Sequence, residues 1–153
     1  MPINETPGDR QREERAIRLY EEHLRRTVGP VTAHRAPLGG KNPCDAIVEI
    51  ENHLLFLEVK CRTISSYKHE TYIISQRKMQ NLQFISIKQT AGLLVHWTDK
   101  MGLFVMQGRS RPRDVTVAMA GRTDRGQEGD QELCWHIPIR LFKMIETSTS
   151  ALL

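Results

Sequence analysis

Apolar residues recur along the N-terminal part of the chain at the spacing of an amphipathic helix. Over residues 9–27, Ile17, Tyr20 and Leu24 fall on one face, three or four residues apart. Asp9 is a suitable N-cap, because its side chain can accept a hydrogen bond from the first helical turn. The pattern therefore predicts a helix of about five turns that buries one stripe of side chains.

Further along the chain, a second helix is predicted over residues 76–89. Ser75 is a suitable N-cap for it, and Met79, Leu82 and Ile85 form its apolar face. The remaining apolar runs are short and rich in branched residues, as is typical of strands. We expect extended segments at residues 31–36, 46–50, 54–60, 71–74, 93–98, 103–106, 115–118 and 134–139, and a short final helix at residues 140–146.

The order helix, strands, helix, strands predicts an α/β fold with a mixed central β-sheet flanked by helices. The chain of 153 residues suits one domain, which we expect over residues 9–153. Residues 1–8 contain Pro2, Pro7 and Gly8 and are expected to be disordered.

The first two long apolar runs are expected to form a hairpin with charged residues at one end. The turn lies at residues 51–53, so Asp45, which precedes the first strand, comes beside Glu58 near the end of the second. Side chains alternate along a strand, so Glu58 and Lys60 point to the same face. Two carboxylates and one ammonium group are thus expected to converge at one edge of the sheet.

These residue types suit metal-assisted hydrolysis of a phosphodiester. Carboxylate oxygens bind hard cations such as Mg²⁺, and an adjacent lysine can orient or deprotonate an attacking water. Solvated charges at the ends of two strands remain the alternative. Glu58 and Lys60 continue the apolar row of Leu54 and Phe56, however, and burial of a carboxylate along such a row is costly unless a cation compensates.

Glu13 is a further candidate ligand on the first predicted helix. It lies four residues before Ile17, at the end of the apolar stripe, whereas Glu14 is rotated away from that stripe. A carboxylate in this position can complete a metal site. It can equally be an acidic residue of the first turn that the helix dipole favours, and periodicity does not choose between the two.

Composition and charge narrow the classes of function. Hydrophobic residues make up 39% and charged residues 26% of the chain, as in globular proteins, and no apolar run is long enough to cross a membrane. The net charge of +4 is compatible with a nucleic-acid partner. Neither a Gly-x-Ser-x-Gly motif nor a nucleotide-binding P-loop is present. The three cysteines show no metal-type spacing, which indicates reduced thiols and a cytoplasmic protein.

The acidic motif resembles that of a known enzyme superfamily. Asp45, Glu58-Val59-Lys60 and the helix-borne Glu13 are similar to the PD-(D/E)XK nucleases, and most of all to archaeal-type Holliday junction resolvases. The interval between the first two acids (58 − 45 = 13) matches that family. The resemblance covers residues 9–106 and leaves residues 107–153 as a C-terminal extension, as in a divergent and virus-borne member.

The resemblance implies a restriction-endonuclease-like core and a metal-dependent endonuclease that cuts four-way DNA junctions as a homodimer. Asp45 and Glu58 would hold Mg²⁺, which Mn²⁺ could replace, with the Val59 carbonyl and Glu13 as further ligands. Lys60 would activate or position water, with Gln76 as a weaker candidate for the same task. A virus-borne member would act in the host cytoplasm.

Basic residues bracket the acidic motif in sequence, and they are candidates for contacts to phosphates. A solvated face is the default interpretation of any one cluster, but their repetition around one motif favours DNA contacts. Two alternatives stay open, a restriction-like or repair endonuclease acting on duplex or flapped DNA, and a basic DNA-binding protein with a structural acidic cluster. The candidates for DNA contact are Arg10, Arg12, Arg35, Lys41, Arg62, Lys68, Arg77 and Lys78.

Overall fold

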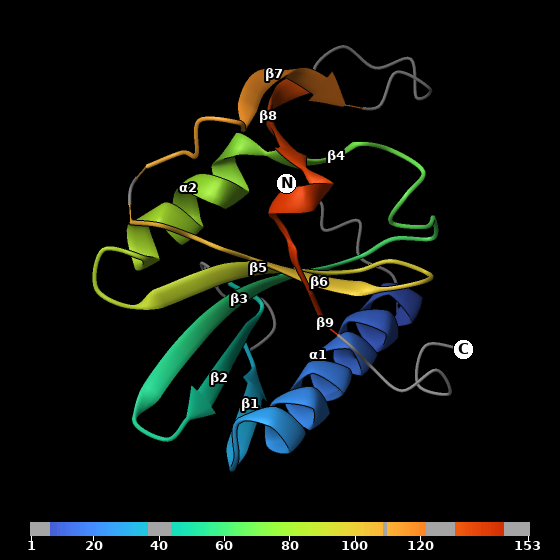
Figure 1. Ribbon diagram of the computed structural model, residues 1–153. Coiled ribbons are helices and arrows are strands. Elements are labelled where there is room, and N and C mark those ends of the chain that lie inside the picture. The colour runs from blue at the N-terminus through green and yellow to red at the C-terminus, as the bar shows by residue number, and fades with distance from the viewer. Residues whose placement is uncertain (1–6, 37–43, 109, 122–130, 146–153) are drawn as a thin grey trace.

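The computed structural model describes residues 7–36, 44–108, 110–121 and 131–145. A central sheet lies between two helices, and a smaller sheet lies on the side of the second helix (Figure 1). The helices are α1 (Pro7–Thr27), α2 (Gln76–Ile85) and the short 3₁₀ helix η1 (Ile139–Leu141). The strands are β1 (Val31–Arg35), β2 (Ala46–Ile50), β3 (His53–Cys61), β4 (Thr71–Ser75), β5 (Thr90–His96), β6 (Met101–Val105), β7 (Thr116–Gly121), β8 (Gln131–Pro138) and β9 (Lys143–Ile145).

The central sheet has six strands in the order β1-β2-β3-β5-β6-β9. Strands β3 and β5 run parallel, and the other neighbouring pairs are antiparallel. A parallel pair needs a crossover connection, and here the connection contains β4 and α2. The predicted α/β class with a mixed central sheet is therefore confirmed.

Each face of the central sheet packs against one helix. Ile17, Tyr20 and Leu24 of α1 pack with inward residues of β2 and β3 such as Leu57. On the opposite face, Met79 and Leu82 of α2 pack with residues of β5 and β6. Because successive side chains of β3 alternate between the faces, Leu57 and Val59 belong to the α1 side. The even-numbered residues of β3 therefore point toward α2.

Both helices differ in their limits from the prediction. Helix α1 begins at Pro7, so residues 7 and 8 are helical, and residues 1–6 of the predicted disordered segment lie outside the described residues. Proline is tolerated in a first helical turn, where its missing N–H would have no intrahelical partner. Helix α2 ends at Ile85, four residues early, and the Ser86 hydroxyl donates a hydrogen bond to the carbonyl of Gly108 (2.6 Å). The predicted N-cap Ser75 is confirmed, since its hydroxyl accepts from the Lys78 N–H.

The predicted final helix over residues 140–146 is wrong. A single 3₁₀ turn, Ile139–Leu141, is followed by β9, which pairs with Met101–Leu103 of β6 at the edge of the central sheet. Hydrogen bonds to β6 and burial of Ile145 favour the extended conformation over a short isolated helix.

The smaller sheet has three strands in the order β4-β8-β7 and was not predicted as a separate sheet. Strand β4 pairs with β8, which is about 60 residues away in the sequence, through pairs such as Tyr72↔Ile137. Trp135 of β8 is 2% exposed and belongs to the core cluster that also contains α2. The smaller sheet therefore helps to hold α2 over the even-numbered face of β3.

Candidate active site

The β2–β3 hairpin brings the two predicted acidic residues together. The register pairs Ala46 with Leu57, so Asp45 lies opposite Glu58, as predicted. The backbone N–H of Asp45 donates to the Leu57 carbonyl (2.8 Å), and its Oδ2 accepts from the Val59 N–H (2.8 Å). These two bonds fix the Asp45 carboxylate at the edge of the sheet, beside the strand that carries Glu58.

Glu58 is buried on the α2 face of β3 and is only 2% exposed. Its Oε1 lies 3.5 Å from the Lys60 Nζ and 3.4 Å from the Lys78 Nζ. Both contacts are ion pairs, and no hydrogen bond of good geometry reaches Oε1 from the described residues. Burial raises the pKa of Glu58, the charge of Asp45 raises it further, and the two lysines oppose the rise. A carboxylate in this environment gains from an additional cation.

Lys78 is part of this cluster, although sequence reasoning assigned it only to DNA contact. It comes from the first turn of α2, where a cation is disfavoured by the helix dipole. Burial lowers the pKa of Lys78, but the charges of Glu58 and Asp45 outweigh that effect and leave it raised. The sequence did carry a signal for this role, because Lys78 is a lysine in the first turn of a helix, where an acidic residue is expected. Gln76, the predicted auxiliary residue, is the first residue of the same helix and is half-buried.

Glu13 is engaged with a basic residue in this structure. Its Oε2 accepts a hydrogen bond from the Arg35 guanidinium (2.7 Å), and Arg35 also donates to the Arg10 carbonyl (3.2 Å). The Glu13 side chain is 16% exposed, against 42% for Glu14, so Glu13 is the more buried of the two, as the apolar stripe predicted. Within the described parts of the chain, no three His, Cys, Asp or Glu side chains gather closely enough to hold a metal.

Asp45 and Glu58 nevertheless fit a hard divalent cation. Mg²⁺ keeps several waters and is commonly bound through one or two carboxylates together with substrate phosphates, so a set of three side chains is not required. The buried Glu58 Oε1, which has no hydrogen bond from the described residues and feels the charge of Asp45, is an atom that such an ion would satisfy. Without the ion, the positive charges of Lys60 and Lys78 balance the negative charges of Asp45 and Glu58.

The sequence from residue 1 to residue 145 matches a family described as "Phage putative PDDEXK endonuclease". The chain belongs to this family. By sequence it matches no curated protein. Among solved structures it is similar to Hjc, a Holliday junction resolvase from the archaeal hyperthermophile Archaeoglobus fulgidus. That likeness has 20% sequence identity and a TM-score of 0.46, and it covers 62% of this chain and 75% of the resolvase chain.

The match to the phage PD-(D/E)XK endonuclease family extends beyond residues 9–106, which carry the resemblance to junction resolvases. The match continues to residue 145, so it includes most of the predicted C-terminal extension. In the structure this segment supplies β7, β8 and β9, and β9 is part of the central sheet. In the described part of the chain, no helix has the length and apolar character needed to span a membrane.

The cysteines near the site have raised pKa values. Burial raises the pKa of Cys44 to about 11, with smaller contributions from Asp45 and Glu58. Burial likewise raises the pKa of Cys61 to about 11. Both are therefore thiols at neutral pH and poor metal ligands or nucleophiles, in line with the prediction of free cysteines.

The other basic candidates for DNA contact have different surroundings. Arg12 forms an ion pair with Asp9, and Arg62 lies over the ring of Tyr72. Lys68 and Arg77 are exposed. Lys41 lies outside the described residues. Their role in binding DNA stays a prediction.

Proposed function

We propose that the chain is a metal-dependent, structure-selective endodeoxyribonuclease that resolves four-way DNA junctions by paired phosphodiester hydrolysis. The observation that carries the proposal is the pairing of Asp45 with the buried Glu58, next to Lys60 and Lys78, in a member of a phage endonuclease family. The choice of a junction as substrate rests on the resemblance of the acidic motif and its spacing to junction resolvases. Such an enzyme would serve DNA recombination or repair in the cytoplasm of an infected cell.

In this proposal Asp45 and Glu58 hold a divalent cation, with the Val59 carbonyl and Glu13 as further candidate ligands. Mg²⁺ is the proposed ion, and Mn²⁺ is expected to replace it. When bound, the cation supplies positive charge to the phosphate and lowers the pKa of a coordinated water. The ion pair with Arg35 engages Glu13 Oε2, so Oε1 is the oxygen proposed to reach the cation.

The lysines and the glutamine have separate proposed roles. Lys60 orients the attacking water or takes its proton, because its Nζ lies beside the metal-binding carboxylate of Glu58. Lys78 comes from α2, and its positive charge stabilises the negative charge that develops on the scissile phosphate in the transition state. Gln76, at the start of the same helix, is a weaker candidate for positioning water or phosphate. The water oxygen bonds to phosphorus as the bond from phosphorus to the leaving oxygen breaks, the proton of the attacking water passes to Lys60 or to solvent, and the leaving oxygen takes a proton from solvent.

A junction has two equivalent strands to cut, so a resolvase needs two active sites related by symmetry. We therefore propose a C₂ homodimer, since this is the simplest assembly that presents two copies of one site. The basic residues predicted to contact DNA would then position the branched substrate through its phosphates.

The proposal is tested by comparing a four-way junction with a linear duplex that contains the same sequence. We expect the wild-type protein to cut the junction symmetrically with Mg²⁺ and to cut nothing with a chelator. An excess of unlabelled duplex should not abolish junction cleavage. The affinity for both DNAs should fall steeply as the salt concentration rises. Asp45→Asn is the matched control for contaminating nucleases.

A restriction-like or repair endonuclease on the same core is the second candidate function. If linear or flapped DNA is cut as fast as the junction, and competes as well for binding, this candidate replaces the resolvase. If Mg²⁺ supports no cleavage of any DNA while binding persists, the chain is a DNA-binding protein whose acidic cluster is structural.

A further inference from the structure

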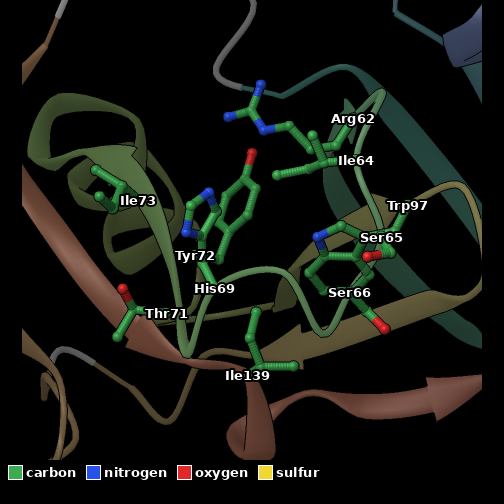
Figure 2. A pocket seen from close by; sticks show the side chains of 10 residues that line it. All are labelled: Arg62, Ile64, Ser65, Ser66, His69, Thr71, Tyr72, Ile73, Trp97 and Ile139. Carbon is green, nitrogen blue, oxygen red and sulfur yellow. The ribbon is translucent and has the colours of Figure 1, made fainter.

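A cavity of about 260 Å³ includes Arg62, the second residue after Lys60, in its lining. Glu58 and Lys60 share the α2 face of β3, and Arg62 continues that row just past the end of the strand. The Arg62 N–H donates to the His96 carbonyl (2.9 Å), which holds this position against β5. Figure 2 shows the cavity between Arg62, the loop that follows it, and the start of β4.

The walls of the cavity are mainly apolar and aromatic. They include Tyr72, Trp97, Ile64 and Ile139 (Figure 2). The Tyr72 and Trp97 rings meet edge to face, with their centroids 6.1 Å apart. Both side chains are nearly fully buried, at 4% and 3% exposed, so the walls are held by packing. These rings and isoleucines offer an isolated phosphate no donor, whereas a ligand with flat apolar faces can pack against them.

Polar side chains line the cavity on several sides, namely Arg62, Ser65, Ser66, His69 and Thr71 (Figure 2). The Tyr72 hydroxyl is buried and has no hydrogen-bond partner among the residues that the structure describes. It points toward Arg62, whose guanidinium lies 4.8 Å from the centre of the Tyr72 ring (Figure 2). Burial raises the pKa of Tyr72, Arg62 opposes the rise and Glu58 adds to it, so the phenol keeps its proton and can donate a hydrogen bond. A buried hydroxyl without a partner is costly, and a ligand would satisfy it.

We propose that this cavity is a subsite for one nucleobase of the DNA strand next to the scissile phosphate, unstacked from its neighbours. The inference rests on the proposed nuclease function, because Arg62, which lines the cavity, follows Glu58 and Lys60 in the same row of side chains. Its volume is below the roughly 300–1,000 Å³ that is typical of small-molecule pockets, which suits a single base better than a whole cofactor. A base offers flat apolar faces to the walls and an edge that accepts a hydrogen bond from Tyr72. The Arg62 guanidinium can stack on it or bind its phosphate.

The first experiment detects the unstacked base directly. 2-Aminopurine, which becomes brighter when it leaves the base stack, is placed at each position around the mapped cut in the DNA. The full-length Asp45→Asn variant then binds this DNA without cutting it. We expect the fluorescence to rise several-fold at one position beside the scissile phosphate. Removal of the base at that position should weaken binding at least about fivefold, the lower end for stacking one base on a protein side chain.

Two variants assign that signal to the cavity. Tyr72→Phe keeps the ring and its packing and removes only the hydroxyl, so the fold should be retained. It should reduce the contribution of that base to the binding affinity about twofold to tenfold, as expected for one neutral hydrogen bond. Tyr67→Phe is the matched control, because Tyr67 is 83% exposed and does not line the cavity. Ser65→Trp fills the cavity from its lining and should abolish both the fluorescence rise and the effect of removing the base.

The subsite and the nuclease function can fail separately. If wild-type protein cuts DNA but no 2-aminopurine position brightens, or if Tyr72→Phe behaves like Tyr67→Phe, the subsite is refuted and the nuclease stands. If no DNA is cut but one base near the branch point brightens in wild-type complexes and Ser65→Trp removes the effect, the cavity binds a base, but the nuclease assignment fails and with it the placement of that base beside a scissile phosphate.

Discussion

Two buried glutamates on opposite faces of the central sheet have very different surroundings. Glu21 of α1 is 5% exposed, and its Oε2 accepts from the Ala33 N–H (2.7 Å) while Arg18 lies 3.1 Å from Oε1. Glu58 is 2% exposed, and among the described residues its Oε1 has two lysines at ion-pair distance. The hydrogen bond from Ala33 and the charges of Arg18 and Arg25 lower the pKa of Glu21 against the effect of burial, whereas the pKa of Glu58 is raised.

The difference separates a structural carboxylate from one suited to chemistry. Glu21 is satisfied by a backbone N–H and by arginines, which do not lose their protons in proteins, so it ties α1 to β1. Glu58 is placed beside a second carboxylate and beside lysines, whose protonation can change. A buried carboxylate that is incompletely satisfied is a candidate for function, because native structures satisfy most buried polar groups.

The largest expected effect comes from removing the charge of Glu58, and removal of the charge of Glu21 provides the comparison. Glu58→Gln should reduce cleavage by at least about 100-fold to 1,000-fold, as for loss of a group that stabilises transition-state charge. Its fold should be retained, since a poorly compensated buried charge is removed. Glu21→Gln should leave cleavage nearly unchanged. Cleavage rates and thermal unfolding of both variants test this pair, and normal cleavage by Glu58→Gln would remove the site assignment.

Asp45→Asn should reduce cleavage as strongly as Glu58→Gln does, but it should keep DNA binding. Removal of a negative charge near a phosphate is expected to leave binding intact or to tighten it. The hydrogen bond from the Val59 N–H can be kept by the asparagine carbonyl oxygen, so the hairpin should remain folded. Binding to uncut DNA in the presence of a chelator is the measurement. A parallel loss of binding would mean that Asp45 organises the fold and not the chemistry.

The cations around the two glutamates provide the next comparison. Lys60→Arg keeps the positive charge near Glu58 but changes its geometry and cannot give up a proton, so cleavage should fall about 100-fold, as should that of Lys60→Ala. Arg18→Lys makes the reverse exchange beside Glu21 and should have little effect on cleavage. Single-turnover rates with saturating DNA separate chemistry from binding. Near-normal turnover by Lys60→Arg would exclude Lys60 as a proton acceptor.

A smaller effect is expected at Glu13, which lies on the same helix as Glu21. If Glu13 contributes to the metal site, Glu13→Ala should reduce cleavage about tenfold or more, whereas Glu14→Ala should be mild. Since Glu13 also binds Arg35, the Arg35→Gln variant is needed as a control for loss of that ion pair. Dependence of the rate on Mg²⁺ concentration is the readout. Equal losses in Glu13→Ala and Arg35→Gln, with an unchanged Mg²⁺ dependence, would identify Glu13 as a structural partner of Arg35.

The sequence predicted the hairpin correctly because its information is local. Alternation of side chains and a short turn set the register, and the register alone places Asp45 opposite Glu58. Glu21 was also within reach of sequence reasoning, since it lies four residues after Ile17 on the apolar stripe, but only Glu13 was singled out. Lys78 carried a local signal too, as a cation in a first helical turn.

The second sheet and strand β9 could not be predicted in the same way, because their conformation depends on distant partners. Strand β9 has three residues and is extended only through its pairing with β6. Strand β4 pairs with β8 in a second sheet, and no local pattern in either strand specifies that partner. The cavity beside the site follows from the same long-range contacts, since Tyr72 and Ile139 come from these segments.

The smallest effect is expected in the pH dependence of stability at Glu21. A carboxylate whose folded pKa is lowered contributes stability above its ordinary pKa, here 4.5, and that contribution is lost as pH falls through the folded value. Glu21→Gln should therefore cost about 1–2 kcal/mol at neutral pH, in line with lost hydrogen bonds to charged partners that are half-exposed. The difference from wild type should shrink progressively below about pH 4.5. Urea unfolding at pH 7 and at successively lower pH measures it, and a difference that stays constant with pH would mean that packing of the Gln side chain, and not charge, sets the loss.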